Sequence, residues 1–514
     1  MRNPFTVFNS LRETYLRYLD SPFDLRYPDL VQERREMLNR DGRIYRQPLL
    51  EVIPAYRKCD EMLSNIAQRL LGPSASWPRD IVNEFIEFVA LGLFPSQQRP
   101  YIHQKVSLEE SVVRGRDMII TTGAGSGKTE CFLLPIAASL ILESTNWTRP
   151  RDRDNQWDWW RHYTTRGQRR VWAPRIRQRN HDTRASAMRA LILYPLNALV
   201  EDQLARLRGG FDSPSVRSWL DDNRSGNRFY FGRYKGRTTT SGARTPRRAG
   251  RLREELTSID QDARRVAGTL AERFFQSMDG SEMWSRWDMQ DNPPDILVTN
   301  YVMLNIMLMR EVETPIFNQT REWLQADPSH VFHLVVDELH TYRGTAGTEV
   351  AYLLRALYNR LSVTPDSNQL RIIASSASLE DDPSGLDYLQ GFFGRSQDRF
   401  RVISGEIDRP DPNAIHVISG CSNAFRELQL AADAADGDIV ESAAESFNSN
   451  VGGPYVPEST SSEQTVASAI EHIQAPDALR VACASPDDLT KSMPRTPDEV
   501  ACSLFPELPA NEAL

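Results

Sequence analysis

The sequence predicts an α/β protein whose core is a parallel sheet. Short runs of apolar residues are separated by stretches with helical periodicity. Runs that are apolar at every position are typical of strands buried on both faces, and the helices between them supply the crossovers that parallel strands need. A glycine-rich turn follows the first run and an acidic pair follows a later one. The five expected strands are 118–120, 190–194, 296–298, 332–336 and 371–374.

The regions on either side of this sheet differ from it in pattern. Residues 1–95 repeat apolar side chains at helical spacing and predict a helical accessory domain. Residues 96–405 hold the sheet, and two basic insertions are expected within them, at 145–189 and 209–290. Residues 406–514 are acidic and rich in Ala, Ser and Pro, which predicts a linker or the start of a further domain.

The net charge of −8 over 514 residues hides an uneven distribution. Twelve arginines and four aspartates lie between residues 149 and 189, interleaved with Trp and Tyr, and ten basic residues without an acid lie between 224 and 253. From Asp411 to the last residue there are seventeen acids and four basic residues, so the first 410 residues are slightly positive. Basic stretches with aromatic residues suit a phosphate backbone with stacked bases, and the alternative is a solvated loop.

Several classes of protein are disfavoured. No apolar run approaches the ~18 residues of a membrane helix, and the first residues lack the apolar block of a secretory signal. The five cysteines are scattered without a Cys-x-x-Cys pair, so neither a disulfide framework nor a zinc ribbon is expected. We expect a reduced, cytoplasmic protein without a membrane partner.

The strongest local signal is the turn TTGAGSGKT at residues 121–129, between an expected strand and an expected helix. This is the context of a P-loop, in which backbone N–H groups and the helix N-terminus bind phosphates. Lys128 is expected to pair with the β- and γ-phosphates of ATP, and the Thr129 hydroxyl to bind Mg²⁺. The first position is Thr rather than Gly, and a chance Gly-Lys-Thr turn is the alternative. The expected phosphate-binding residues are Thr122, Gly123, Ala124, Gly125, Ser126, Gly127, Lys128 and Thr129.

The second signal is Asp337-Glu338-Leu339-His340, at the end of the expected strand 332–336. Paired acids at such a strand end suit phosphoryl transfer: Asp337 would hold Mg²⁺, directly or through water, and Glu338 would orient the attacking water. An ordinary acidic turn is the alternative, and the P-loop upstream makes it improbable. The third signal, Ser376-Ala377-Ser378 after the strand 371–374, has a meaning only together with the other two.

These residues, in this order, resemble superfamily 2 helicases of the DEAD/DEAH box type, whose ATP-binding fold is a RecA-like P-loop domain. The resemblance implies ATP and Mg²⁺ as ligands, with Lys128, Asp337 and Glu338 as catalytic residues. It implies that Gln104, before the P-loop, contacts adenine, and that His340, Ser376, Ala377 and Ser378 couple the nucleotide to a neighbouring domain. Motifs at 194–203 and 298–304 are implied to follow the nucleic-acid backbone through Pro195, Asn197, Ala198, Thr299 and Asn300.

Longer stretches, such as "ALILYPLNALVEDQ" and "VVDELHTYRGTAGTEVAYLLR", resemble large bacterial helicases of DNA repair and of anti-phage defence of the DISARM and Druantia kind. This favours DNA as partner, although the motifs alone leave an RNA helicase open. The family requires a second RecA-like domain with an arginine finger, and no Gln-x-x-Gly-Arg-x-x-Arg pattern follows Ser378. We therefore expect the N-terminal part of a longer or split helicase, weak or inactive alone, or a non-catalytic binding subunit that needs a partner chain.

Overall fold

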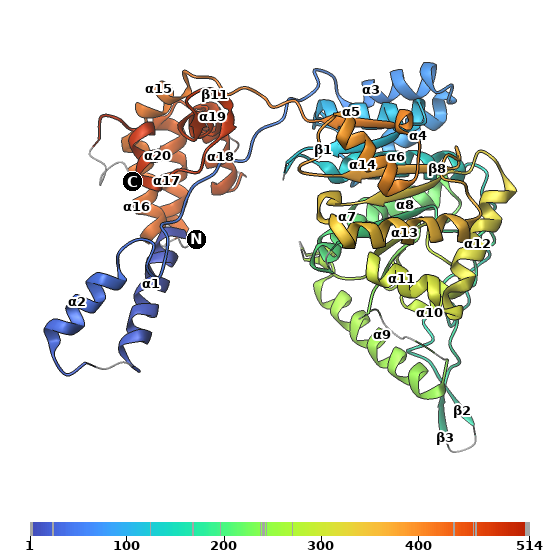
Figure 1. Cartoon of the computed structure of the whole chain (residues 1–514). Coiled ribbons are helices and arrows are strands. Elements are labelled where there is room, and N and C mark those ends of the chain that lie inside the picture. The colour runs from blue at the N-terminus through green and yellow to red at the C-terminus, as the bar shows by residue number, and fades with distance from the viewer. Residues whose placement is uncertain are drawn as a thin grey trace. The chain divides into compact units, whose positions relative to one another are not determined.

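The computed structural model divides the chain into two compact units, one formed by residues 56–406 and the other by residues 1–55 together with 407–514 (Figure 1). Each unit is described by itself below. The structure describes residues 4–508 except 23–24, 124, 167–168, 196, 237, 239–241, 243, 270, 435–436, 456 and 458–459.

The larger unit is built on a seven-stranded sheet in the order β5-β6-β4-β7-β8-β1-β9, and every neighbouring pair of strands is parallel. The strand that precedes the glycine-rich turn, β1, lies between β8 and β9. Because all strands run the same way, the polar segments that follow them meet at one edge. The strands are β1 Asp117–Thr121, β4 Ala190–Tyr194, β5 Phe231–Tyr234, β6 Ile296–Asn300, β7 Phe332–Val336, β8 Leu370–Ser375 and β9 Phe400–Ser404.

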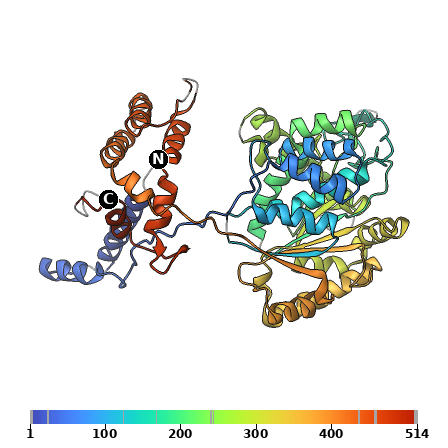
Figure 2. The same ribbon diagram turned by 90° about the horizontal axis from the view of Figure 1, so that it is seen from above.

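Helices cover both faces of this sheet, as Figure 2 shows. One apolar core joins the sheet to a first layer of helices, and a second core joins its other face to a second layer. Strands buried on both sides are apolar at almost every position, which is why the sequence displayed them so clearly. The first layer contains α3 Leu63–Arg69, α4 Arg79–Ala90, α5 Ile102–Leu108, α6 Lys128–Ser144, α7 Asn197–Asp212 and α8 Pro214–Asn223, and the second α11 Tyr301–Met309, α12 Thr314–Ala326, α13 Gly344–Leu361 and α14 Pro383–Phe393.

The predicted α/β fold with a parallel sheet is confirmed, and the five expected strands are β1, β4, β6, β7 and β8. Two strands of the seven-stranded sheet were not predicted. β5 has the sequence FGRY, whose Gly and Arg hide a strand at the edge of the sheet, and β9 alternates buried and exposed residues instead of forming an apolar run. The missed β5 lies inside the segment 209–290, so that segment is in part a component of the sheet rather than an insertion.

The boundary predicted near residue 95 differs from the one in the structure, which falls at residues 55 and 56. The helical pattern over 81–89 is α4, whose Phe85 and Phe88 are fully buried in the first core. Its apolar face thus covers the sheet domain instead of forming an accessory domain. Helical periodicity reports that a face is buried, not which element buries it.

The segments 145–189 and 244–291 fold together into a small third core beside the sheet. Trp159, Trp160 and Trp287 are each 1% exposed in it, packed under the long helix α9 Pro246–Val266. The hairpin β2 Tyr163–Arg166 and β3 Arg169–Trp172 and the helix α10 Arg286–Asp291 complete this region, called the insertion domain below. The insertion domain is therefore a packed structure and not a solvated loop.

The smaller unit combines both ends of the chain. Its core is built from buried Ala, Ile and Phe side chains, and Leu50 and Val52 pack against it from the N-terminal segment. The acidic region predicted as a linker or further domain is thus a helical body of its own. Its elements are α1 Pro4–Asp20, α2 Pro28–Leu38, α15 Ala414–Ser419, α16 Ser422–Ala434, α17 Gly437–Asn450, α18 Ser462–His472, α19 Ala475–Ala482, β10 Ala484–Ser485, β11 Asp488–Ser492 and α20 Pro497–Leu504.

Among the residues that the structure describes, no helix combines the length and the apolar character needed to cross a membrane.

Candidate active site

The glycine-rich turn connects β1 to α6 at the carboxyl edge of the sheet. Gly125 and Gly127 have φ values of +73° and +71°, a left-handed backbone that glycine adopts without strain. Gly127 caps α6, so Lys128 and Thr129 occupy its first turn, where free N–H groups and the helix dipole favour an anion. The loop borders a cavity of about 310 Å³ whose lining includes residues 125–129, and the predicted Ala124 lies outside the described residues.

Side chains from residues 56–104 hold this loop in place. The N–H of Gly123 donates to the Tyr56 hydroxyl over 2.7 Å, and a nitrogen of the His103 ring lies 2.7 Å from the Ser126 carbonyl oxygen. Within the loop, the Ser126 hydroxyl lies 2.6 Å from that of Thr122. Tyr56 and His103 also form an edge-to-face ring contact. Sequence reasoning missed Tyr56, because nothing in the sequence places it beside a loop 67 residues away.

Gln104 bonds with the backbone at both ends of its amide. Its oxygen accepts from the N–H of Tyr101 at 2.9 Å, and its nitrogen donates to the carbonyl of Gly127 at 3.2 Å. It is 3% exposed and lines the cavity beside the phosphate loop. Gln104, the predicted adenine contact, therefore lines the same cavity as the glycine-rich turn and supports that turn.

The acidic pair follows β7 at the same edge. Asp337 is 9% exposed and accepts a hydrogen bond from the Ser375 hydroxyl, while the Glu338 N–H donates to that same hydroxyl over 3.0 Å. Burial raises the pKa of the Asp337 carboxyl. Glu338 has φ 52° and ψ 49°, a left-handed conformation that is costly for a residue with a side chain and is found most often at functional sites. Ser375 thus fixes both acids, and the sequence analysis missed it by one residue.

The acids face the phosphate loop. The Lys128 ammonium lies 3.4 Å from a carboxylate oxygen of Glu338, so the ends of β1 and β7 meet although 210 residues separate them. A hydroxyl (Thr129), a buried carboxylate (Asp337) and a second carboxylate (Glu338) are hard oxygen groups, which fit Mg²⁺ together with phosphate and water. In the described part of the chain no three His, Cys, Asp or Glu side chains are grouped so as to hold a metal by themselves.

The predicted coupling residues lie close to the acidic pair. The Ala377 N–H donates to the His340 ring over 3.2 Å, and the same ring lies 3.4 Å from the second oxygen of Glu338. The hydroxyl of Ser376 accepts from the Ser378 N–H over 3.4 Å. A change at Glu338 is thus connected through His340 to the segment that follows β8.

The predicted nucleic-acid contacts line the other half of the same edge. Thr299 is 1% exposed and its hydroxyl donates to the Tyr234 carbonyl at 2.6 Å, so its side chain supports the sheet. Asn300 caps α11 by accepting from the Met303 N–H over 2.8 Å. Pro195 is half-buried after β4, while the side chains of Asn197 and Ala198 lie outside the described residues.

Helix α7, which begins at Asn197, also contacts the phosphate-loop helix directly. The Gln203 amide donates to the Thr129 hydroxyl over 3.3 Å, and Arg206 forms an ion pair with Glu130 over 3.0 Å. The first of these contacts joins the segment 194–203, predicted to follow nucleic acid, to Thr129, the residue predicted to bind Mg²⁺. In the sequence, the i, i+3 spacing of Gln203 and Arg206 indicates that both side chains lie on one face of the helix.

The basic residues of the insertion domain bind acids and aromatic rings within the chain. Arg184 is bonded to Asp295 at 2.7 Å and lies 3.6 Å over the Trp147 ring. Trp159 and Trp160 are buried, so they are not available to stack on bases. The prediction that this Arg- and Trp-rich stretch as a whole binds a phosphate backbone is thus not supported, because most of its described side chains stabilise the insertion domain.

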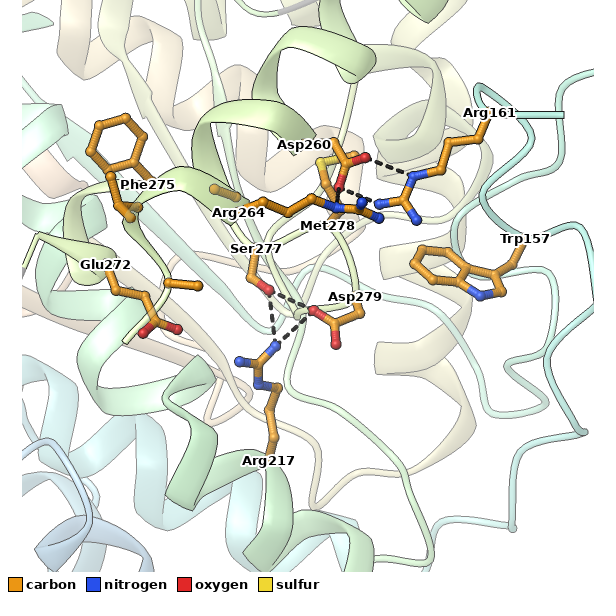
Figure 3. Close-up of a pocket in the computed structure, with 13 residues that line it drawn as sticks. Trp157, Arg161, Arg217, Asp260, Arg264, Glu272, Phe275, Ser277, Met278 and Asp279 are labelled. Atoms are coloured by element: carbon orange, nitrogen blue, oxygen red, sulfur yellow. Dashed lines mark hydrogen bonds and ion pairs between the residues drawn. The ribbon is translucent and has the colours of Figure 1, made fainter. Parts of the chain in front are cut away.

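A cavity of about 380 Å³ in this region shows the same pairing (Figure 3). Arg161 points to Asp260, while Arg217 points to Asp279, 2.9 Å away, and to Ser277. Three arginines and three acids line it, counting Arg264 and Glu272. The charges therefore balance, and the cavity offers no excess of positive charge to an anion.

Comparison with known proteins agrees with this arrangement of motifs. Residues 101–228, which include the glycine-rich turn and the whole of α7 and α8, match the DEAD/DEAH box helicase family. The Druantia protein DruE of Escherichia coli (strain UMEA 4076-1) is 32% identical in an alignment of length 469 that covers 82% of this chain. The chain contains a DEAD/DEAH box helicase domain. The chain spans 23% of the length of DruE.

Solved helicase structures also resemble the chain. The DUF1998 helicase MrfA bound to DNA is 15% identical with a TM-score of 0.34, over 83% of this chain and 46% of that one. MrfA bound to DNA and AMPPNP is 14% identical with a TM-score of 0.36, over 86% and 47% of the two chains. The helicase domain of Hef from Pyrococcus furiosus is 11% identical with a TM-score of 0.27, over 74% and 57%.

Proposed function

We propose that this helicase domain is the ATP-binding module of a DNA translocase. The observation that carries the proposal is the approach of Lys128 to Glu338 at the carboxyl edge, where Ser375 fixes the acidic pair. Such a constellation is what phosphoryl transfer requires: a cation for the phosphates, a carboxylate for the metal and a carboxylate for the water.

Each residue then has a defined role. The Lys128 ammonium dissociates from Glu338 and binds the β- and γ-phosphates of ATP. Thr129 and Asp337 would hold Mg²⁺, which would supply positive charge next to the phosphates. Glu338, released from Lys128, orients the attacking water and accepts its proton. Gln104 holds the carbonyl of Gly127 and thereby keeps the phosphate loop in shape.

The proposed nucleic-acid partner is DNA, which would cross the carboxyl ends of β4 and β6. Turnover would need a second RecA-like domain to supply an arginine finger, and the segment around Ser376 and His340 would sense it. The similarity to DruE supports a role in anti-phage defence, and a role in DNA repair is the related proposal.

The experiment measures nucleotide affinity and ATP turnover of the chain with and without single-stranded DNA, for the natural sequence and for Lys128→Ala. We expect the natural chain to bind Mg²⁺-ATP, to hydrolyse it slowly, and to gain turnover when a second RecA-like half is added. Lys128→Ala is expected to remove nucleotide binding. Gln98→Ala is the matched control, because it borders the same cavity away from the phosphates.

Turnover that survives in Lys128→Ala would reject the assignment of the phosphate site. Nucleotide binding without turnover, even with the second half and DNA present, would favour the non-catalytic binding subunit. Competition between matched DNA and RNA strands decides the nucleic acid, since stronger binding of RNA would replace the DNA proposal.

A further inference from the structure

Two basic side chains at the end of β5 share one carboxylate. Arg233 donates to both oxygens of Glu201, over 2.5 and 2.6 Å, and the Lys235 ammonium donates to one of them over 2.5 Å. Two cations thus face a single anion, so the cluster keeps one positive charge in excess. This distinguishes it from the cavity in Figure 3, where arginines and acids are equal in number.

The cluster lies in line with the proposed nucleic-acid edge. β5 pairs with β6 so that Tyr234 is opposite Thr299, and the carboxyl end of β6 leads directly into Asn300. Glu201 belongs to α7, the helix that follows β4, which is the other neighbour of β6. The two cations and their acid therefore extend the row formed by the ends of β4 and β6.

Hydrogen bonds hold the backbone that carries these two cations. The Thr238 hydroxyl donates to the carbonyl of Arg233 at 3.0 Å and accepts from the N–H of Lys235 at 3.0 Å. Arg286 donates to the carbonyl of Lys235. Between the two cations, the Tyr234 ring is buried and its hydroxyl donates to Glu313 at 2.8 Å. Backbone so held presents its cations in a constant position, which is a requirement for binding a defined ligand.

Glu201 resembles a backbone phosphate in its charge and in its hydrogen-bond acceptors. Its two oxygens carry one negative charge and accept N–H bonds from both partners, as the two free oxygens of a phosphodiester do. The Glu201 side chain is 52% exposed, while those of Arg233 and Lys235 are 31% and 12% exposed, so solvent reaches the carboxylate and weakens its two ion pairs. A carboxylate in this position is easily displaced by a ligand of like charge.

We propose that Arg233 and Lys235 form a binding site for a nucleic-acid phosphate and that Glu201 occupies this site in the free protein as a built-in competitor. The inference rests on the proposed function, since it assigns a further contact and its regulation to the same edge. Nucleic acid displaces Glu201 from the two cations when it binds. Because Glu201 and Gln203 lie on the same helix, this displacement acts on the helix that contacts Thr129.

The test measures the affinity of the whole chain for a fluorescent single-stranded DNA over a series of salt concentrations. Removing the competitor by Glu201→Gln is expected to raise affinity about fivefold, the equivalent of ~1 kcal/mol. The double substitution Arg233→Gln with Lys235→Gln is expected to weaken binding uniformly across sequences and to reduce the salt slope by about 1–2. In that double background, Glu201→Gln should have no further effect.

Glu322→Gln, which removes the same charge from the exposed face of α12, is the matched control and should leave affinity unchanged. Thermal unfolding of each variant checks that it is folded, and the single Arg233→Gln replaces the double variant if that fails to fold. A gain from Glu201→Gln that persists without the two cations overturns the inference, because it would then be a general charge effect.

The outcomes separate this inference from the proposed function. Binding by the natural chain that Glu201→Gln leaves unchanged rejects the competitor alone. Binding that appears only in Glu201→Gln supports it. Absence of binding by every variant rejects both the competitor and the nucleic-acid part of the proposed function, while nucleotide binding remains a separate measurement.

Discussion

The insertion domain and the carboxyl edge of the sheet both collect basic residues, but they hold them in different ways. In the insertion domain, the Arg184 side chain is 3% exposed, bonded to the fully buried Asp295. At the edge, Arg233 is 31% exposed and its partner Glu201 is 52% exposed. Breaking a buried pair by removing one partner costs about 3–5 kcal/mol, whereas an exposed pair contributes about 0–1 kcal/mol. Burial of the partner, and not the number of charges, separates a structural cation from one that is available to a ligand.

The largest expected effect is therefore on stability in the insertion domain. Arg184→Ala leaves the buried Asp295 with Arg189 as its remaining described ion-pair partner, and we expect the free energy of unfolding to fall by about 3–5 kcal/mol. Denaturant unfolding measures it. Arg177→Ala is the control, since that side chain is 56% exposed, and it should change stability by less than about 1 kcal/mol. Equal losses of unfolding free energy in the two variants would contradict the distinction between buried and exposed ion pairs.

The next effect is on catalysis at the edge. Ser375→Ala removes the hydroxyl that donates to Asp337 and accepts from the Glu338 N–H, so both acids lose their alignment. Loss of such a supporting partner lowers activity about 10–100-fold in comparable sites. ATP turnover in the presence of the second half and DNA measures it. Ser396→Ala is the control, because its hydroxyl contacts Asp366 instead of the acidic pair, and an equal loss there would contradict the role of Ser375.

A third effect depends on pH. Asp212, at the end of α7, is 5% exposed, and burial raises its pKa to about 7 although Arg217 opposes the rise. At pH values between the unfolded pKa near 4 and the folded pKa, the folded state binds more protons than the unfolded state. Protonation of Asp212 therefore stabilises the folded chain at low pH, and this stabilisation is lost as the pH rises through 7.

Asp212→Asn keeps an acceptor for the Ser281 N–H but removes the titration. The difference in unfolding free energy between the natural chain and this variant should change by about 2 kcal/mol between pH 5.5 and pH 8, in favour of the variant at high pH. Unfolding by denaturant at both values is the measurement. Asp222→Asn, on an exposed position of α8, should show no such change. A constant difference for Asp212→Asn would mean that the carboxyl is charged throughout.

The smallest effect concerns the support of the phosphate loop. Tyr56→Phe leaves the Gly123 N–H without its acceptor, and we expect a loss of about 1 kcal/mol in unfolding free energy. Differential scanning calorimetry can detect a shift of this size. Tyr352→Phe is the control, since that side chain is 71% exposed. No shift for Tyr56→Phe would mean that residues 56–104 pack on the loop without stabilising it.

The sequence allowed the parallel sheet to be predicted, because buried strands are apolar throughout. It also indicated the two halves of the proposed nucleotide site, because glycine and acid patterns are local. It did not allow Ser375 or Tyr56 to be predicted, since each acts through a contact with residues far away in the chain. The roles of Arg184 and Trp160 were misjudged for a related reason. A basic, aromatic stretch has the same composition whether its partners are bases or buried acids.

The position of β1 in the sheet has a consequence for synthesis on the ribosome. The strand that carries the phosphate loop pairs only with β8 and β9, and the latter ends at Ser404. At a typical rate of 5–20 residues per second, β1 waits roughly 15–60 s after it is made before both neighbours exist. During that time its apolar residues need protection, so a nascent chain shorter than about 400 residues should depend on chaperones and should not yet retain nucleotide.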